Sequence, residues 1–244
     1  MVELGRYDYL LSALPALEPI GSIPPMSKRE FLEQVVDSKG PSETVAVVLL
    51  SDDLIQYESL LAKETEPDQT DLAVLSVDKA SNEPVLPEFL LVEEQSEQQE
   101  NKRASSDGLW SRFFRHAASI ARRNNSSFLK AWTGFEVGLR NALVEARAHI
   151  LELDAAAYMV TPQLADNDID YSSILSAWSG APNPLDAMEY LDKARWDWLE
   201  EHGGWYNFSA GEIEVYAARL VLLHRWRRIF SENSRQDKTD KVLN

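Results

Sequence analysis

The sequence predicts an all-α, mainly helical fold: an elongated multi-helix body with long amphipathic helices. Apolar residues recur at three- and four-residue spacing over several long stretches, as on one face of a helix. Serine or asparagine precedes several of these stretches at helix-starting positions. The 244 residues are 44% hydrophobic, which is enough for a sizeable core. A minor β contribution is expected only within residues 44–92.

The first elements follow from prolines and a capping pattern. Residues 7–17 are expected to form a short helix or an extended entry segment, followed by a proline-rich turn. Ser27 precedes Glu30 by three residues, the spacing at which each side chain caps the other's backbone amide. We therefore expect a helix from Ser27 to about Lys39 that stops at Gly40-Pro41.

Two interpretations compete for residues 42–62. Residues 44–50 are β-prone by composition, whereas the leucines and isoleucine of residues 54–61 recur at helical spacing. We favour a helix over the whole stretch. The short apolar runs 72–77 and 89–92 are expected to pack or pair locally.

A polar run over residues 93–108 is the predicted boundary. Its Gln, Glu, Ser and Asn content cannot bury enough apolar area to order itself. The predicted organisation is therefore an N-terminal helical region over 1–92, this linker, and a C-terminal helical region over 109–232. Residues 233–244 are expected to be a frayed tail.

Two amphipathic helices are predicted after the linker. The first carries arginines on one face and, on the other, Trp110, Phe113, Phe114, Ala117, Ile120 and Ala121. The second begins at Ser126 or Ser127 and spans about 26 residues, or roughly 39 Å. Its expected inward stripe is Phe128, Trp132, Phe135, Leu139, Leu143, Ala146, Ile150 and Leu153.

Two more helices close the chain. Asn183 is a helix cap with Pro184 at the first helical position, where proline's missing amide needs no partner. The expected face of this helix is Leu185, Met188, Leu191, Arg195, Trp198 and Leu199. The last helix starts at Ser209 with Glu212 as its capping partner. It is expected to bury Ile213, Tyr216, Leu220 and Leu223, with Ile229 or Phe230 at its end.

Charge and composition limit the classes of partner. Residues 1–108 hold 22 acidic and 8 basic residues, and the whole chain has a formal charge of −16. Such acidity disfavours nucleic acid and an anionic membrane surface, while permitting a basic protein partner. No cysteine, signal peptide or membrane-spanning run is evident, so we expect a cytoplasmic protein without direct membrane insertion.

Familiar catalytic and ligand-binding patterns are missing from the sequence. Neither glycine-rich phosphate loop occurs, and the four histidines lack metal-ligand spacing. Asp166, Asp168 and Asp170 alternate as in a calcium loop, but Tyr171 and Ala177 occupy the positions that require glycine and glutamate. We therefore interpret them as a solvated acidic loop and predict no catalytic residue, no metal ligand and no cofactor.

Several residues are instead candidates for a structural network or a partner contact: Glu136, Arg140, Asn141, Arg147, Arg195 and Trp196. Glu136 precedes Arg140 by four residues, a favourable order for an intrahelical ion pair. Arg140 and Asn141 could enter a buried polar network or contact a partner. Most tryptophans are expected in the core. Trp196 and Trp198 cannot face the same way, however, so an exposed anchor for a partner is expected there.

Four segments together resemble the bacterial domain-of-unknown-function family 2764. They are residues 7–15 (YDYLLSALP), 135–143 (FEVGLRNAL), 181–185 (APNPL) and 191–199 (LDKARWDWL). Members of that family are encoded among the subunits of V-type (A-type-like) ATPases. They look like the counterpart of the C subunit, the all-helical cap between rotary stalk and membrane ring.

The resemblance implies a non-catalytic accessory or central-stalk component of a bacterial V-type ATPase. Its partners would be the central-stalk and membrane-ring subunits, and it would lie peripherally on the inner face of the cell membrane through that enzyme. Two alternatives stay open. One is a free-standing regulator or assembly factor of the same complex. The other is a hydrolase using Asp166, Asp168 and Asp170 with a nearby histidine.

Overall fold

The computed structural model describes residues 7–78, 83–91, 106–204 and 207–243, with side chains up to Phe230 except that of Asp68. The fold is mainly helical, as predicted: the structure is 68% helical, with eight α-helices and one two-stranded sheet in the described part. None of the helices within these ranges combines the length and apolarity needed to cross a bilayer.

The helices are α1 Asp8–Ala13, α2 Lys28–Asp37, α3 Ser42–Leu61, α4 Ser106–Arg123, α5 Ser127–Leu151, α6 Ser172–Ser179, α7 Pro184–His202 and α8 Ala210–Leu243. Short 3₁₀ turns are η1 Pro67–Gln69, η2 Glu88–Leu90, η3 Ala155–Tyr158 and η4 Pro162–Leu164. Strands β1 Ser76–Val77 and β2 Pro84–Val85 pair antiparallel, with Ser76 opposite Val85. The minor β content therefore lies within the expected range of residues.

The chain divides into two compact units built from interleaved segments. Unit 1 contains Met1–Asp53, Asp71–Val74 and Asp192–Asn244, and unit 2 contains Leu54–Thr70 and Leu75–Leu191. This division differs from the linear one because unit 1 draws on both ends of the chain. Residues 93–105 of the predicted linker lie outside the described residues, and residues 106–108 open α4.

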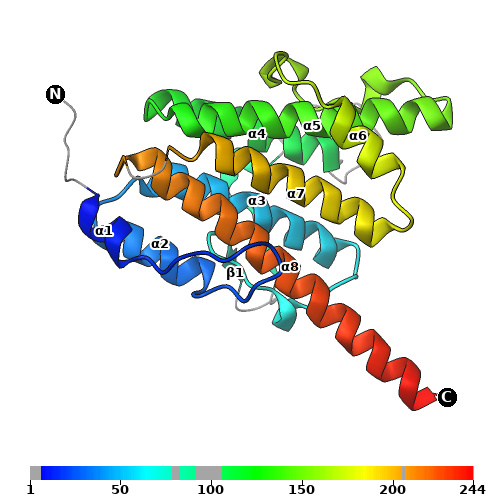
Figure 1. Cartoon of the computed structure of the whole chain (residues 1–244), viewed down its shortest axis with the longest axis horizontal. Helices are drawn as coiled ribbons and strands as arrows, with labels where there is room; N and C mark the ends of the chain where they lie inside the picture. The colour runs from blue at the N-terminus through cyan, green and yellow to red at the C-terminus, as the bar shows by residue number, and fades with distance from the viewer. Residues whose placement is uncertain (1–6, 79–82, 92–105, 205–206, 244) are drawn as a thin grey trace. The chain divides into compact units, whose positions relative to one another are not determined.

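In unit 1, the predicted capping box is confirmed. The Ser27 side chain accepts from the Glu30 amide, and Glu30 accepts from the Ser27 amide at 2.8 Å. Helix α2 lies beside α8 (Figure 1), and the rings of Phe31 and Tyr216 are 5.0 Å apart. The Tyr216 hydroxyl also donates to the carbonyl oxygen of Pro15 at 3.0 Å. These contacts join the N-terminal segment to the last helix.

The ambiguity over residues 42–62 is settled in favour of a helix. Helix α3 covers Ser42–Leu61, so the β-prone residues 44–50 are its first turns. Val45, Val48 and Leu49 are at most 2% exposed. A helix that is apolar on most sides is a buried core helix, and its composition then resembles that of a buried strand.

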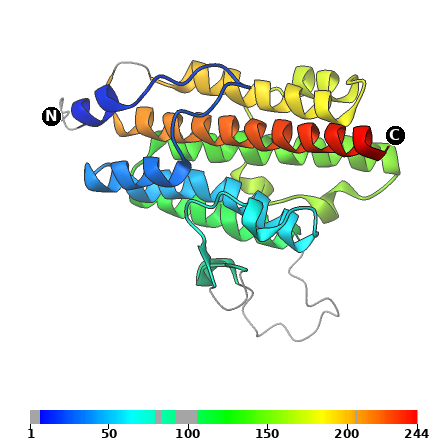
Figure 2. The same cartoon turned by 90° about the horizontal axis from the view of Figure 1, so that it is seen from below.

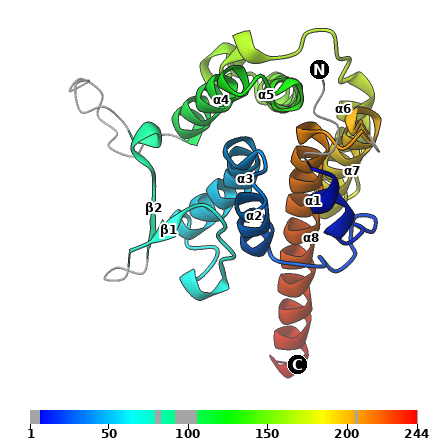
Figure 3. The ribbon, with the colours of Figure 1, turned by 90° about the vertical axis from the view of Figure 1, so that its left-hand side faces the viewer.

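In unit 2, α4 and α5 lie side by side (Figure 3). All six residues of the predicted α4 face are buried. On α5, Gly138 allows the Tyr171 side chain to cross the helix closely, and the Tyr171 hydroxyl donates to the carbonyl oxygen of Phe135 at 3.1 Å. Gly134 allows the loop before α6 to approach α5 closely, and its carbonyl oxygen accepts from the Asp166 amide at 3.1 Å.

The inward stripe predicted for α5 is wrong at its C-terminal end. Phe128, Phe135 and Leu139 are buried, but Ile150 is 70% and Leu153 is 48% exposed. Helix α5 has 25 residues and α4 has 18, so the last turns of α5 extend beyond the helix against which it packs. Helical spacing predicts which side of a helix is apolar but not how far its neighbour reaches.

Caps of the last two helices follow the sequence in part. The Asn183 side chain accepts from the Asp186 amide at the start of α7, as expected. Glu212 accepts from the amide of Phe208, one residue before the predicted cap. Ile213, Leu220 and Leu223 are buried, whereas Phe230 is 47% exposed.

Helix α8 continues to Leu243 (Figure 2), so the backbone of the predicted tail is helical up to that residue. Fraying of residues 233–244 stays a prediction.

The crossing at Gly138 predicts the effect of a single methyl group. In Gly138→Ala the new Cβ would overlap the hydroxyl and ring carbons of Tyr171, so we expect a loss of about 1–3 kcal/mol in the free energy of unfolding. Urea denaturation followed by circular dichroism measures it. Gly134→Ala is the matched control because its nearest contact would be a milder 3.3 Å. A Gly138→Ala protein at least as stable as the parent would contradict this packing.

Candidate functional site

The most concentrated polar chemistry in unit 1 is a buried cluster around Lys28. Lys28, Asp52 and Asp53 are all 0% exposed. The Lys28 ammonium contacts the Asp52 carboxylate directly and lies 3.4 Å from Asp53. Arg228 of α8 donates to both oxygens of Asp52. Buried charges persist only when paired and hydrogen-bonded, so this cluster, hereafter the Lys28 cluster, fixes α2, α8 and the middle of α3 together.

Opposing effects set the ionisation of Asp52. Burial alone raises the pKa of a carboxyl group, because the charged form loses its hydration. The positive charges and hydrogen bonds of Lys28 and Arg228 outweigh burial and hold the pKa of Asp52 well below its ordinary value. Asp52 is therefore a carboxylate that supplies structure, in contrast to a general acid, which must carry a proton.

The same cluster secures a four-residue segment, Asp71–Val74. The Asp53 carboxylate accepts from the backbone amides of Ala73 and Val74, the latter at 2.7 Å. Arg29 donates to the carbonyl oxygen of Leu72 at 2.9 Å. These contacts explain why this segment belongs to unit 1 although its sequence neighbours belong to unit 2.

His224 provides the remaining tie to this segment. Its Nδ1 lies 3.1 Å from a carboxylate oxygen of Asp71, and its Nε2 lies 2.8 Å from the carbonyl oxygen of Met26. Both groups are acceptors, so each ring nitrogen is placed to donate. The hydrogen bond from His224 lowers the pKa of Asp71, with help from the charges of Lys28 and Arg228 against a smaller effect of burial.

A second buried carboxylate, Asp192 of α7, is 0% exposed and accepts from two arginines. Its Oδ1 lies 3.0 Å from Arg195 and 3.1 Å from Arg225 of α8. Arg195, a predicted contact residue, therefore serves an internal ion pair that joins α7 to α8. Its predicted partner contact remains untested.

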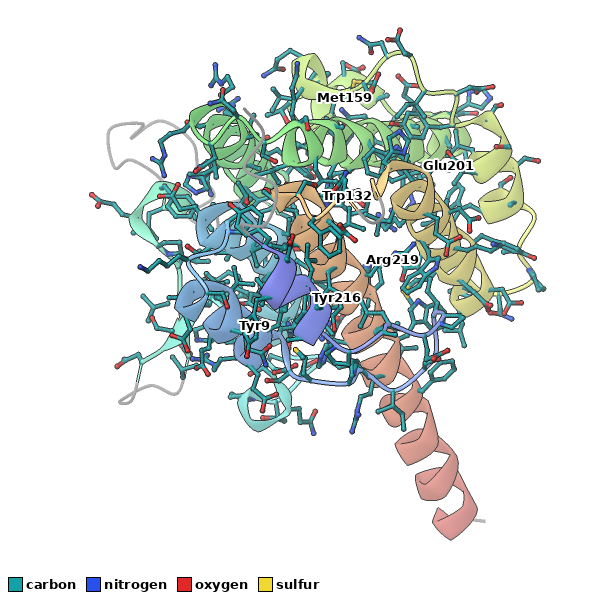
Figure 4. All side chains as sticks on the ribbon, turned by 60° about the vertical axis from the view of Figure 1, so that its left-hand side comes forward. Tyr9, Trp132, Met159, Glu201, Tyr216 and Arg219 are labelled. Atoms are coloured by element: carbon teal, nitrogen blue, oxygen red, sulfur yellow. The ribbon has the colours of Figure 1, made fainter. Side chains whose placement is uncertain are left out.

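The structure corrects the prediction for Trp196. Trp196 and Trp198 are each 7% exposed, so the prediction of an exposed anchor in this pair is wrong. The Trp196 indole donates to Glu200 at 3.1 Å, and the Arg219 guanidinium lies 4.7 Å from its ring centroid. Figure 4 labels Arg219 on α8. The buried residues of α7 are Asp192, Trp196, Trp198 and Leu199, so the predicted face is confirmed at Trp198 and Leu199 and lacks Asp192 and Trp196.

In unit 2, Asn141 lies in a buried polar contact, one of the two roles considered for it. Its side-chain amide donates to the carbonyl oxygen of Val160 at 3.0 Å and accepts from the Val160 amide at 2.9 Å. The next residue, Thr161, has φ 40, which is strained for a β-branched side chain. Asn141 thus fixes the strand-like segment that precedes this strained turn.

The other predicted residues of α5 also contact their own unit. Arg140 lies 3.2 Å from Asp107 and 5.2 Å from the centroid of the Trp110 ring, so it contacts α4. Its intrahelical pair with Glu136 stays a prediction. A carboxylate and an aromatic face of α4 thus both attract the Arg140 guanidinium. Arg147 lies 5.4 Å from the Trp178 ring centroid, and Glu136 is half-buried.

The acidic loop serves local backbone structure. Asp166 accepts from the Asp168 amide, and Asp170 accepts from the amide and hydroxyl of Ser172 at the start of α6. The hydrogen bonds from Ser172 lower the pKa of Asp170. Across the described ranges, no group of three or more His, Asp or Glu side chains is arranged to hold a metal ion.

Sequence reasoning missed the Lys28 cluster, although one signal was present. Two adjacent aspartates, Asp52 and Asp53, interrupt an apolar helix between Leu50 and Leu54. Carboxylates in such a helix require buried cations. Nothing local identifies Lys28 or Arg228 as those cations.

Comparisons of the chain with models of protein families, with curated proteins and with solved structures give no match. Family membership accordingly stays a prediction from the four quoted segments.

Removal of Lys28 tests the cluster energetically. Lys28→Met leaves two buried carboxylates with less positive charge, and we expect a loss of about 3–5 kcal/mol in the free energy of unfolding. Lys193→Met is the matched control, because Lys193 forms an exposed pair with Asp197 and should matter by less than about 0.5 kcal/mol. Urea denaturation compares the two. Equal small effects would mean that the cluster contributes little.

Acid should weaken unit 1 through Asp71. Because the folded pKa of Asp71 is lowered, its contribution to stability is complete above the ordinary aspartate pKa of about 3.9 and is lost as pH falls through the folded value. Asp71→Asn should therefore show a shallower fall of the unfolding free energy below about pH 4. Urea denaturation at a series of pH values measures the slope. Asp168→Asn, in the exposed acidic loop, is the control, and an identical slope in Asp71→Asn and the parent would refute the assignment.

Proposed function

We propose that this chain is a non-catalytic protein-binding component of a bacterial V-type ATPase, similar to the C subunit of that enzyme, that links the rotary stalk to the membrane ring. One observation carries the proposal: all four segments that resemble family 2764 supply packing or capping positions of the helical units. A shared fold produces resemblance at such positions, because core contacts and caps constrain residue type.

The four segments have specific structural uses. In residues 7–15, Leu10 is buried and the Pro15 carbonyl accepts from α8. Residues 135–143 carry the close crossing at Gly138 and the buried Asn141. Residues 181–185 cap α7, and residues 191–199 contain the buried Asp192.

The use of the charged groups supports a binding role over a reaction centre. The buried carboxylates Asp52, Asp53 and Asp192 accept hydrogen bonds from cations or backbone amides of their own unit. A catalytic carboxyl needs an open face toward a substrate and a pKa near the working pH. Asp52 meets neither condition, being 0% exposed with a lowered pKa. Because these buried groups serve the fold itself, we expect binding to occur on the exposed surfaces.

Co-purification tests this proposal. The full chain, tagged at its genomic locus, should recover stalk and ring subunits of the V-type ATPase from detergent-solubilised membranes, with and without a lysine-reactive crosslinker. A strain lacking the central-stalk subunits is the control and should yield no ring subunits. Stoichiometric recovery without crosslinking indicates an integral component, and recovery only with crosslinking indicates a transient regulator or assembly factor. Absence of every ATPase component after crosslinking would contradict the proposal.

A further inference from the structure

The surface of unit 2 where η2 lies against α4 (Figure 3) combines arginine side chains with exposed apolar side chains. Phe89 of η2 stacks on His116 of α4, with ring centroids 3.7 Å apart and planes 10° apart. Phe89 is nevertheless 41% exposed, and Leu91 is 52% exposed. We call this region, formed by Phe89, Leu91, Arg112, Arg115 and His116, the α4–η2 surface.

Two arginines give this surface its charge. Arg112 donates through Nε to the carbonyl oxygen of Leu90 at 2.8 Å, and its Nη2 is buried without a hydrogen-bond partner in the described part of the chain. Arg115, one turn further along α4, is exposed and forms no ion pair within the described ranges. Burial and the charge of Arg115 both lower the pKa of Arg112, because each disfavours its charged form.

The positive charge is concentrated in one stretch of the sequence. Residues 108–135 contain five basic and no acidic residues, although the chain carries −16 overall. Asp107, the acid nearest to this stretch on α4, pairs with Arg140. Glu88 is the one acid of η2, and it is exposed. A basic surface on an acidic protein selects an anionic partner and repels basic ones.

We propose that the α4–η2 surface binds an acidic segment of a partner protein, in which an apolar side chain contacts Phe89 and Leu91 while a flanking carboxylate binds the exposed Arg115, beside the positive charge of Arg112. Arginine suits this role because its planar guanidinium binds carboxylates through two parallel hydrogen bonds. Exposed apolar residues between charges are a common anchor pattern in protein interfaces. The inference rests on the proposed protein-binding function and adds the surface and the chemistry of its partner.

A photo-crosslinking amino acid at Leu91 of the full chain, irradiated in cells, tests the surface. The expected adduct is with a protein segment that carries Asp or Glu beside an apolar residue, as read by mass spectrometry of the crosslinked peptide. Arg115→Glu should lower the adduct yield roughly tenfold, because one reversed charge replaces an attraction with a repulsion. Arg227→Glu is the matched control, an equal charge change at an exposed arginine of α8, and should leave the yield unchanged.

The isolated peptide then gives a direct measurement. A synthetic copy should bind the parent chain roughly ten times more tightly than it binds Arg115→Glu, and a copy with its acids changed to lysine should bind Arg115→Glu more tightly than it binds the parent. Circular dichroism of Arg115→Glu should match the parent, since Arg115 is exposed. Equal affinity of the two chains for the acidic peptide would overturn the proposal.

Other outcomes separate the two proposals. No adduct, an adduct lacking acids, or Arg115-dependent binding only to phosphatidylglycerol vesicles would overturn the acidic-segment proposal, the last by assigning the surface to lipid. If Arg115→Glu still recovers the whole ATPase in equal yield, the surface proposal fails while the proposed function stands. An Arg115-dependent acidic partner outside the ATPase would support the surface proposal and contradict the ATPase role.

Discussion

The ion pairs of the Lys28 cluster are the constraint on which unit 1 depends. Lys28 is separated from Asp52 by 24 residues, and Arg228 by 176, yet the two cations meet at this one buried carboxylate. Removal of one charge leaves its partners unpaired in a medium of low polarity, which is far less favourable than their hydration in water. The cluster therefore joins α2, α3 and α8 through one set of paired charges.

A second consequence is the capture of a short segment from the middle of the chain. Asp53 holds the amides of Ala73 and Val74, and His224 holds Asp71, so residues 71–74 lie in unit 1 while their neighbours lie in unit 2. Backbone groups that would otherwise need a strand or a helix partner are satisfied by these side chains. A compact unit can thus combine distant segments when buried side chains supply the missing hydrogen bonds.

Spacing patterns within single helices predicted much of the fold. They predicted little of the polar network, because its ion pairs join residues that are far apart in the sequence. The Ser27–Glu30 box, the Asn183 cap and the apolar face of α4 each arise within one helix, so their residue spacing was sufficient. The inward aspartates Asp52 and Asp192 were missed because Lys28, Arg228 and Arg225, which contact them, lie on other helices. Trp196 was misplaced because one of the contacts that surround it, with Arg219, comes from another helix, α8. Ile150 was misplaced because α5 extends beyond the end of α4.

The central claim is that the buried Asp52 is ionised and paired within the fold, and its carboxyl carbon reports on its ionisation directly. Carbon-13 NMR of this group can be followed as pH is lowered, with circular dichroism recording the folded fraction. The account predicts that Asp52 keeps the chemical shift of a carboxylate through the ordinary aspartate range near pH 4, until unfolding begins. Protonation of Asp52 in that range while the protein remains fully folded would contradict it.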